Sequence, residues 1–153
     1  MAGTSQKTHR HACLSWSEAV SKSLCSGWIH SQVKPIDGET YRQLFSQRKP
    51  RSGWPRVNKE KSQQLLAAGQ MMPAGLAAIE TAQQNGSWAL LDEVDALGVP
   101  PDLAQALQAS PVANNYFASL SRTDWCNILQ WLVIARRPET RQRRLAESVT
   151  LAA

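Results

Sequence analysis

The chain has 153 residues, 42% of them apolar, and a formal net charge of +5. These values fit one globular domain that can bury about two-thirds of its unfolded surface without a structural metal or disulfide. No apolar run reaches the roughly 18–20 residues of a membrane span, and the N-terminus has no apolar core of a secretory signal. The sequence therefore predicts no transmembrane segment and a cytoplasmic location.

Charge is segregated along the chain. The formal net charge is +7 over residues 1–62, −5 over residues 63–135 and +3 over residues 136–153. Such a distribution attracts an anionic partner or aligns the subunits of an oligomer. It also fits helices that differ only in solvated charge, and the pattern by itself leaves these interpretations open.

Residues 1–14 are polar and predict a flexible arm. His9, His11 and Cys13 alternate within it, as metal ligands on one side of an extended segment would. A fourth ligand is not in view, so no metal site is expected. The three cysteines of the chain form no CxxC pair and predict free thiols in a reducing compartment.

One helix and one hairpin are predicted next. Ser15 and Glu18 have the capping-box spacing of a helix start. Residues 28–36 and 40–45 are rich in β-forming side chains, and Asp37-Gly38 between them has the chemistry of a two-residue hairpin turn. Because two strands alone are marginally stable, this hairpin must pack on helices or on another strand.

The rest of the chain is predicted to be helical. The expected helix starts are Asn58 as N-cap, Pro73, Pro101, Pro111, the Ser121–Asp124 capping pair, and Pro138. The fold class is thus α+β, mostly helical, with one β-hairpin packed on a multi-helix C-terminal bundle. Beyond the arm, a single domain is expected over residues 15–153, with helix and hairpin in residues 15–57 and the helical part in residues 58–153.

No catalytic motif is present. The sequence lacks a G-x-S-x-G elbow, a Walker loop and a G-x-G-x-x-G turn, and its carboxylates are not paired. Cys25 and His30 lack the third, orienting group of a thiol nucleophile. We therefore expect a protein that is not an enzyme, with no catalytic residue, cofactor or metal.

Basic clusters supply the candidate binding residues. The stretch RSGWPRVNKEK, residues 51–61, surrounds a tryptophan with cations, a composition that holds phosphates and stacks on rings. Three arginines of the last helix share a face, which would meet either a ligand or the acidic middle segment. The candidate anion-binding residues are Trp28, Lys34, Arg48, Arg51, Trp54, Arg56, Lys59, Arg137, Arg141 and Arg144. In the competing interpretation, the two tryptophans close the core under a loop.

Four stretches together resemble the YdeI/OmpD-associated family, whose members are also described as bacteriocin-protection proteins. They are SWSEAVSKSLCSGWIHSQVKPIDGETYRQLFSQRKPRSGWPRVNK, GQMMPAGLAAIETAQQNGSW, VPPDLAQAL and ARRPETRQRR. The resemblance runs from about Ser15 to the C-terminus. Family members usually have a longer segment with a Trp-rich strand before the EAV helix, so this chain resembles an N-terminally shortened member.

The resemblance implies a bacterial stress protein that gives resistance to cationic antimicrobial peptides, and its porin-linked description implies the periplasm. It supplies no catalytic residues. The leading hypothesis is a non-enzymatic protein that acts by binding an anionic ligand or a protein partner. The alternative is a nucleic-acid-binding protein that uses the basic loop 48–61 and the C-terminal arginine helix. A protein partner would require an exposed apolar patch near the hairpin edge.

Overall fold

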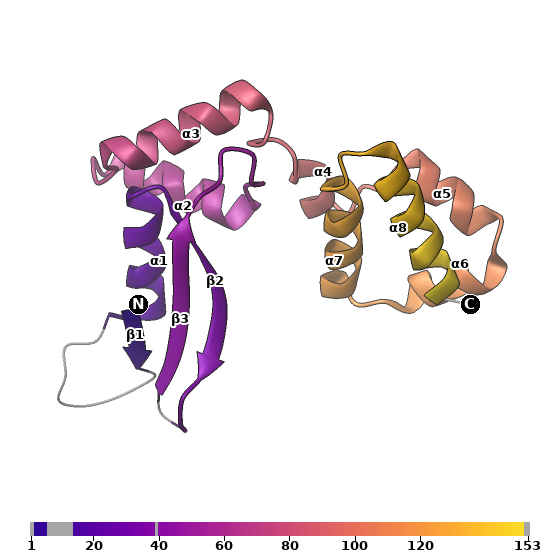
Figure 1. Ribbon diagram of the computed structural model, residues 1–153, viewed down its shortest axis with the longest axis horizontal. Helices are drawn as coiled ribbons and strands as arrows, with labels where there is room; N and C mark the ends of the chain where they lie inside the picture. Colours follow the sequence, from indigo (N-terminus) through magenta and orange to yellow (C-terminus); the bar gives the residue numbers. More distant parts are fainter. Residues whose placement is uncertain (1, 6–13, 39, 152–153) are drawn as a thin grey trace. The chain divides into compact units, whose positions relative to one another are not determined.

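The computed structural model describes residues 2–5, 14–38 and 40–151 (Figure 1). The chain divides into two compact units, residues 1–89 and 90–153. This division differs from the single domain expected over residues 15–153, and the boundary falls beyond residue 57. The reason is that the helices of residues 56–85 complete the core of the N-terminal unit.

The N-terminal unit is a small sheet with three helices. Its elements are β1 (Ala2–Ser5), α1 (Trp16–Cys25), β2 (Trp28–Pro35), β3 (Thr40–Gln47), α2 (Arg56–Ala67) and α3 (Pro73–Asn85). The C-terminal unit is helical within its described residues. Its elements are α4 (Asp92–Asp95), α5 (Pro101–Gln108), α6 (Pro111–Ser119), α7 (Arg122–Val133) and α8 (Pro138–Leu151). The expected α+β, mostly helical fold with an antiparallel hairpin is confirmed.

The sheet has the strand order β1-β3-β2, and both pairings are antiparallel. The predicted hairpin is β2–β3, but its loop is longer than two residues because the Ile36 N–H donates to the Thr40 carbonyl. The Asp37 carboxylate accepts from the Thr40 N–H at 2.7 Å, which fixes the turn. Residues 2–5, expected in a flexible arm, form the third strand. His9, His11 and Cys13, which were considered as metal ligands and for which no metal site was expected, lie outside the described residues.

Most helix ends follow the local signals in the sequence. Ser15 and Glu18 form a complete capping box, with the Ser15 N–H donating to Glu18 Oε2 at 2.8 Å. Ser121 caps α7 as predicted, and α6 begins at the predicted Pro111 with Ser110 as its N-cap. Asn58 is not an N-cap, because α2 already begins at Arg56. The short helix α4 was not predicted.

Each unit has its own hydrophobic core. In the N-terminal unit it consists of Val20, Leu24, Cys25, Trp54, Leu65, Ile79 and Ala82. In the C-terminal unit it consists of Leu91, Val94, Leu103, Leu107, Ala113, Phe117, Leu129 and Leu132. Among the described residues, no helix is both long and apolar enough to cross a membrane.

Candidate functional site

The basic loop and Trp88 form a stack in which two adjacent tryptophan rings lie between two cations. The guanidinium carbon of Arg48 lies 3.8 Å from the centre of the Trp54 ring, and the Trp54 and Trp88 ring centres are 5.0 Å apart. Lys59 Nζ lies 5.4 Å from the centre of the Trp88 ring at the other end. Trp54 is only 1% exposed, so it is a core residue rather than a surface contact. This burial supports the competing interpretation for Trp54, in which the ring closes the core under the loop.

Arg48 is also inside the unit, with 8% of its surface exposed. Its Nη1 donates to the Gly53 carbonyl at 3.0 Å, whereas Nε and Nη2 have no hydrogen-bond partner in the described part of the chain. Burial lowers the pKa of this arginine to about 10. A buried cation without a carboxylate is costly, and here the Trp54 ring face and a carbonyl offset part of that cost. The side chain therefore organises the loop and does not present a charge to solvent.

The remaining loop cations do not join into one patch with the stack. Arg51 and Arg56 are exposed, and Arg56 Nε lies 2.9 Å from Glu60 Oε1 one turn along α2. Trp28 is 42% exposed at the start of β2, beside Phe45 and Lys22 of a small cavity. The N-terminal candidates thus fall into a buried group and scattered surface positions.

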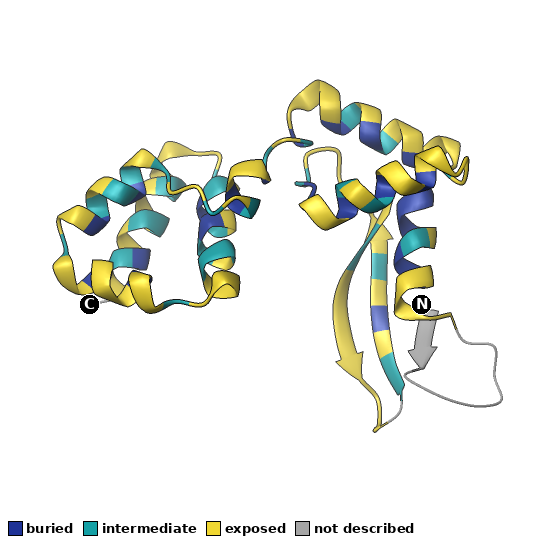
Figure 2. Ribbon diagram, turned by 180° about the vertical axis from the view of Figure 1, so that it is seen from behind, coloured by how far each residue is buried: buried dark blue, intermediate teal, exposed yellow. Residues whose placement is uncertain are grey.

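Lys34, one of the candidate anion-binding residues, belongs to an exposed surface that was not predicted from the sequence. In the β2–β3 register Lys34 lies directly opposite Arg42, and both side chains are exposed. Ile36 follows Lys34 by two positions and Leu44 follows Arg42 by two, so all four residues belong to the same face of the sheet. Ile36 is 59% exposed and Leu44 is 42% exposed. We call these four residues the outer sheet face. Figure 2 shows β2 exposed along most of its length.

This face has two features that packing alone does not explain. Like charges directly opposite each other weaken a strand pair. Two large aliphatic side chains beside them remain in water instead of packing on a helix. A cation and an aliphatic residue two positions apart, Lys34 with Ile36 and Arg42 with Leu44, were a signal for this face. The strand register that places Lys34 against Arg42 could not be predicted from the sequence.

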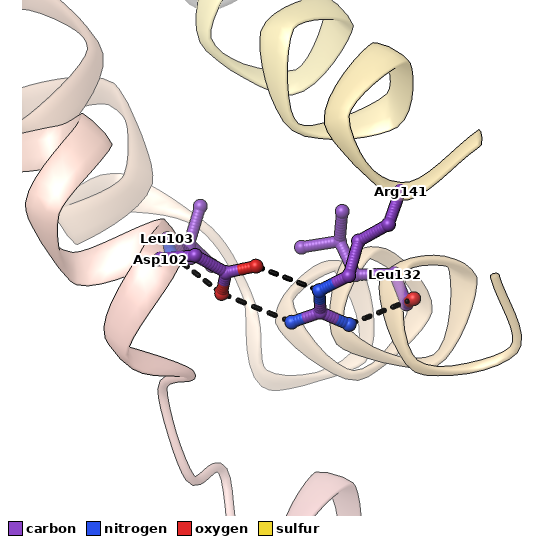
Figure 3. Close-up of polar contacts among 4 residues, drawn as sticks. All are labelled: Asp102, Leu103, Leu132 and Arg141. Atoms are coloured by element: carbon purple, nitrogen blue, oxygen red, sulfur yellow. Dashed lines mark hydrogen bonds and ion pairs between the residues drawn. The ribbon is translucent and has the colours of Figure 1, made fainter. Parts of the chain in front are cut away.

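Two of the three C-terminal arginines are engaged within their own unit. Arg141 forms a forked pair with Asp102, with Nε 2.6 Å from Oδ2 and Nη2 2.9 Å from Oδ1 (Figure 3). Its Nη1 donates to the Leu132 carbonyl at 3.1 Å. The hydrogen bonds to Arg141 lower the pKa of Asp102, and those to Asp102 raise the pKa of Arg141. The predicted contact with the acidic middle segment is therefore present.

Arg144 has a similar internal role. Its guanidinium carbon lies 5.0 Å from the centre of the Trp131 ring, and Nη1 donates to the Trp131 carbonyl near the end of α7. Arg137 is exposed at the start of the last helix. The arginine stripe consequently joins α8 to α5 and α7, and only Arg137 is left fully on the surface.

Replacing Asp102 by asparagine should destabilise the C-terminal unit by roughly 1 kcal/mol at neutral pH, because the pair is forked but partly exposed to solvent. The pKa of Asp102 is lower in the folded chain than its ordinary 3.8, so its contribution is complete above that pH. The loss should shrink as the pH falls below 3.8. Denaturant unfolding of both proteins at pH 7 and at pH 3 measures this, and Glu93→Gln, at an exposed carboxylate of the same unit, is the control.

The described residues hold no group of three or more His, Cys, Asp or Glu side chains that could bind a metal ion. Cys25 is buried and Cys126 is half-buried, and both are free thiols. Cys25 packs in the core of its unit, which fits a small apolar residue.

Comparison with protein families assigns the two units separately. Residues 2–78 match a domain of unknown function (DUF8412), and residues 96–153 match the family described as Bacteriocin-protection, YdeI or OmpD-Associated. The chain therefore belongs to the DUF8412 family and carries a C-terminal domain of the YdeI/OmpD-associated, bacteriocin-protection family. The second match is narrower than the resemblance from Ser15 onward that the motifs suggested. Comparisons with curated proteins and with solved structures gave no match.

Proposed function

We propose that the protein is a bacterial stress protein that protects the cell against cationic antimicrobial peptides by binding, without catalysis. The description of the family matched by the C-terminal unit supports the protective role. The observation that carries the binding role is the outer sheet face, where Lys34 and Arg42 lie side by side between the exposed Ile36 and Leu44.

The partner that this face fits is a protein with an acidic and partly apolar surface. Aliphatic side chains at the centre of an interface supply apolar burial, and complementary charges set orientation and rate of association. Direct capture of a cationic peptide is unfavourable, because the N-terminal unit carries a formal net charge of +6. Protection would then act through a component of the cell rather than through the peptide itself.

We assign this action to the cytoplasm, and the free thiols Cys25 and Cys126 agree with a reducing compartment. The bacteriocin-protection description would also fit the periplasm. Fractionation of cells that express the full chain separates the two locations.

Cells that express the full chain should survive a cationic antimicrobial peptide better than cells without it. The variant Lys34→Glu with Arg42→Glu should lose this protection, because charge reversal places like charges against an acidic partner and should weaken binding at least about tenfold. Lys22→Glu with Lys49→Glu, which makes the same charge change at two exposed cations outside the sheet face, is the matched control. Survival is counted after exposure, and circular dichroism checks that each variant folds.

Two results would reject parts of this proposal. No gain in survival with the unmodified chain would reject the protective function. Full protection by the double variant would reject the outer sheet face as its site. A photoreactive amino acid at position 44 then tests the contact directly, since it should crosslink an acidic protein only when Lys34 and Arg42 are intact.

Nucleic-acid binding is the second candidate, and the paired cations Lys34 and Arg42 are the observation that favours it. Trp54, the ring expected to stack on bases, is buried, and Arg141 is engaged with Asp102. Titration with a short DNA duplex at two salt concentrations tests it. Saturable binding whose affinity falls steeply with salt, and which the double variant loses, would favour this candidate.

A further inference from the structure

A cavity of about 380 Å³ lies beside the start of α2 in the N-terminal unit. We call it the helix-start pocket. Its lining residues are Trp16, Val20, Ile29, His30, Pro55, Val57, Asn58 and Lys61. They come from α1, β2, α2 and the residue before α2, so the fold assembles the pocket from distant stretches of the chain. None of them was among the ten residues that the sequence suggested. The volume is within the range of about 300–1,000 Å³ typical of small-molecule sites.

The walls of the pocket are mainly apolar and partly aromatic. Trp16 meets His30 edge to face, with ring centres 5.7 Å apart and planes at 78°. Two of the lining residues are open to solvent: Trp16 is 48% exposed and Val57 is 69% exposed. A flat ring can therefore reach apolar and aromatic surface from outside without displacing core residues.

The polar groups around the pocket favour an anion. Lys61 lies on its lining and donates to Ser17 Oγ at 2.7 Å, which holds the ammonium group in place. Among the described residues no carboxylate lines the pocket, and α2 begins with neither a side-chain cap nor an acidic residue in its first turn. The N–H groups and the dipole of a helix start attract negative charge.

Asn58 is a second polar group on the wall of the pocket. The residue is 8% exposed and lines the pocket, and its side-chain amide is not among the fully buried polar atoms that lack a partner. A few polar groups on the wall of a mainly apolar pocket fix the orientation of a ligand. A ligand carboxylate in the pocket would accept from this amide.

We propose that the helix-start pocket binds a small aromatic carboxylate. The ring lies against Trp16 and Val57, and the carboxylate accepts hydrogen bonds from Lys61 and Asn58. His30 supplies an aromatic wall in its neutral form, since burial and then the charge of Arg48 lower the pKa of this histidine. This binding does not depend on the outer sheet face or on the protective function proposed above.

The test is calorimetric titration of the full chain with naphthalene-2-carboxylate and with its neutral analogue, naphthalene-2-methanol. The carboxylate should bind with a Kd of about 1 mM or tighter, which is ordinary for a ligand of this size, and the alcohol about tenfold more weakly. Lys61→Met should reduce carboxylate affinity to that of the alcohol. Lys22→Met makes the same charge change on an exposed helix position outside this pocket and should bind like the unmodified chain.

Asn58→Leu separates binding from folding. It replaces the amide by an apolar side chain of similar size, so carboxylate affinity should fall, and the unfolding midpoint shows whether the variant still folds. Chemical-shift changes on binding should centre on residues 29–30 and 57–61. The proposal is overturned if the carboxylate does not saturate, if the alcohol binds equally well, or if Lys22→Met loses as much affinity as Lys61→Met.

Discussion

Replacing Trp54 by alanine should destabilise the N-terminal unit by about 3–5 kcal/mol, the usual cost of removing a large aromatic side chain from a core. The ring is 1% exposed and lies between Arg48 and Trp88. Its removal leaves a cavity and also uncovers a buried cation that has no carboxylate partner among the described residues. A single domain often has only 5–15 kcal/mol of stability, so the variant should unfold readily.

The matched control is Trp28→Ala in the same unit. Trp28 is 42% exposed, so its loss should cost less than about 1 kcal/mol. Denaturant unfolding of the full chain gives the two free energies, and hydrogen exchange in residues 1–89 assigns the loss to the N-terminal unit. Equal costs for the two variants would contradict the placement of Trp54 in the core and would restore it as a surface contact.

Replacing Gly75 by alanine should also be strongly destabilising, by about 1–3 kcal/mol, although alanine normally favours a helix over glycine by about 1 kcal/mol. Gly75 lies in the first turn of α3 against the end of α1. A Cβ atom there would overlap the Cys25 carbonyl oxygen and lie 2.9 Å from the Cys25 carbonyl carbon. The backbone cannot yield easily, because the Met72 N–H donates to the same Cys25 carbonyl at 3.1 Å.

Gln83→Ala, at an exposed position of the same helix, is the control and should change stability by no more than about 0.5 kcal/mol. The midpoints of thermal unfolding compare the two variants. A Gly75→Ala variant as stable as the unmodified chain would mean that α1 and α3 are not in close backbone contact.

Both predictions concern the same question, which is whether the tryptophans and glycines of the N-terminal unit serve packing or binding. The structure assigns Trp54 and Gly75 to packing. It leaves the outer sheet face and the helix-start pocket as surfaces whose composition packing does not explain. The protective function and the small-molecule site can fail independently, since the first depends on Lys34 and Arg42 and the second on Lys61 and Asn58.

The sequence by itself determined the elements whose signals are local. Ser15 with Glu18, Pro73 and Ser121 with Asp124 mark helix starts that the structure contains, because capping and proline geometry involve only residues within one turn. The prediction of Asn58 as an N-cap was wrong because it also used only local signals. A local reading favours asparagine as a cap, whereas Pro55 lets α2 start at Arg56 and carries Asn58 into the unit.

Tertiary structure alone decided which charges reach solvent. Arg48 and Arg51 look equivalent in the sequence. In the structure the Arg48 backbone N–H donates to the Gly27 carbonyl, and Arg48 is buried. Arg141 meets Asp102 across 39 positions of the chain. Strand register places Lys34 against Arg42, and the turn between α1 and β2 brings the ring of Trp16 next to that of His30. Composition counts charges, but burial and pairing between distant segments decide what each charge does.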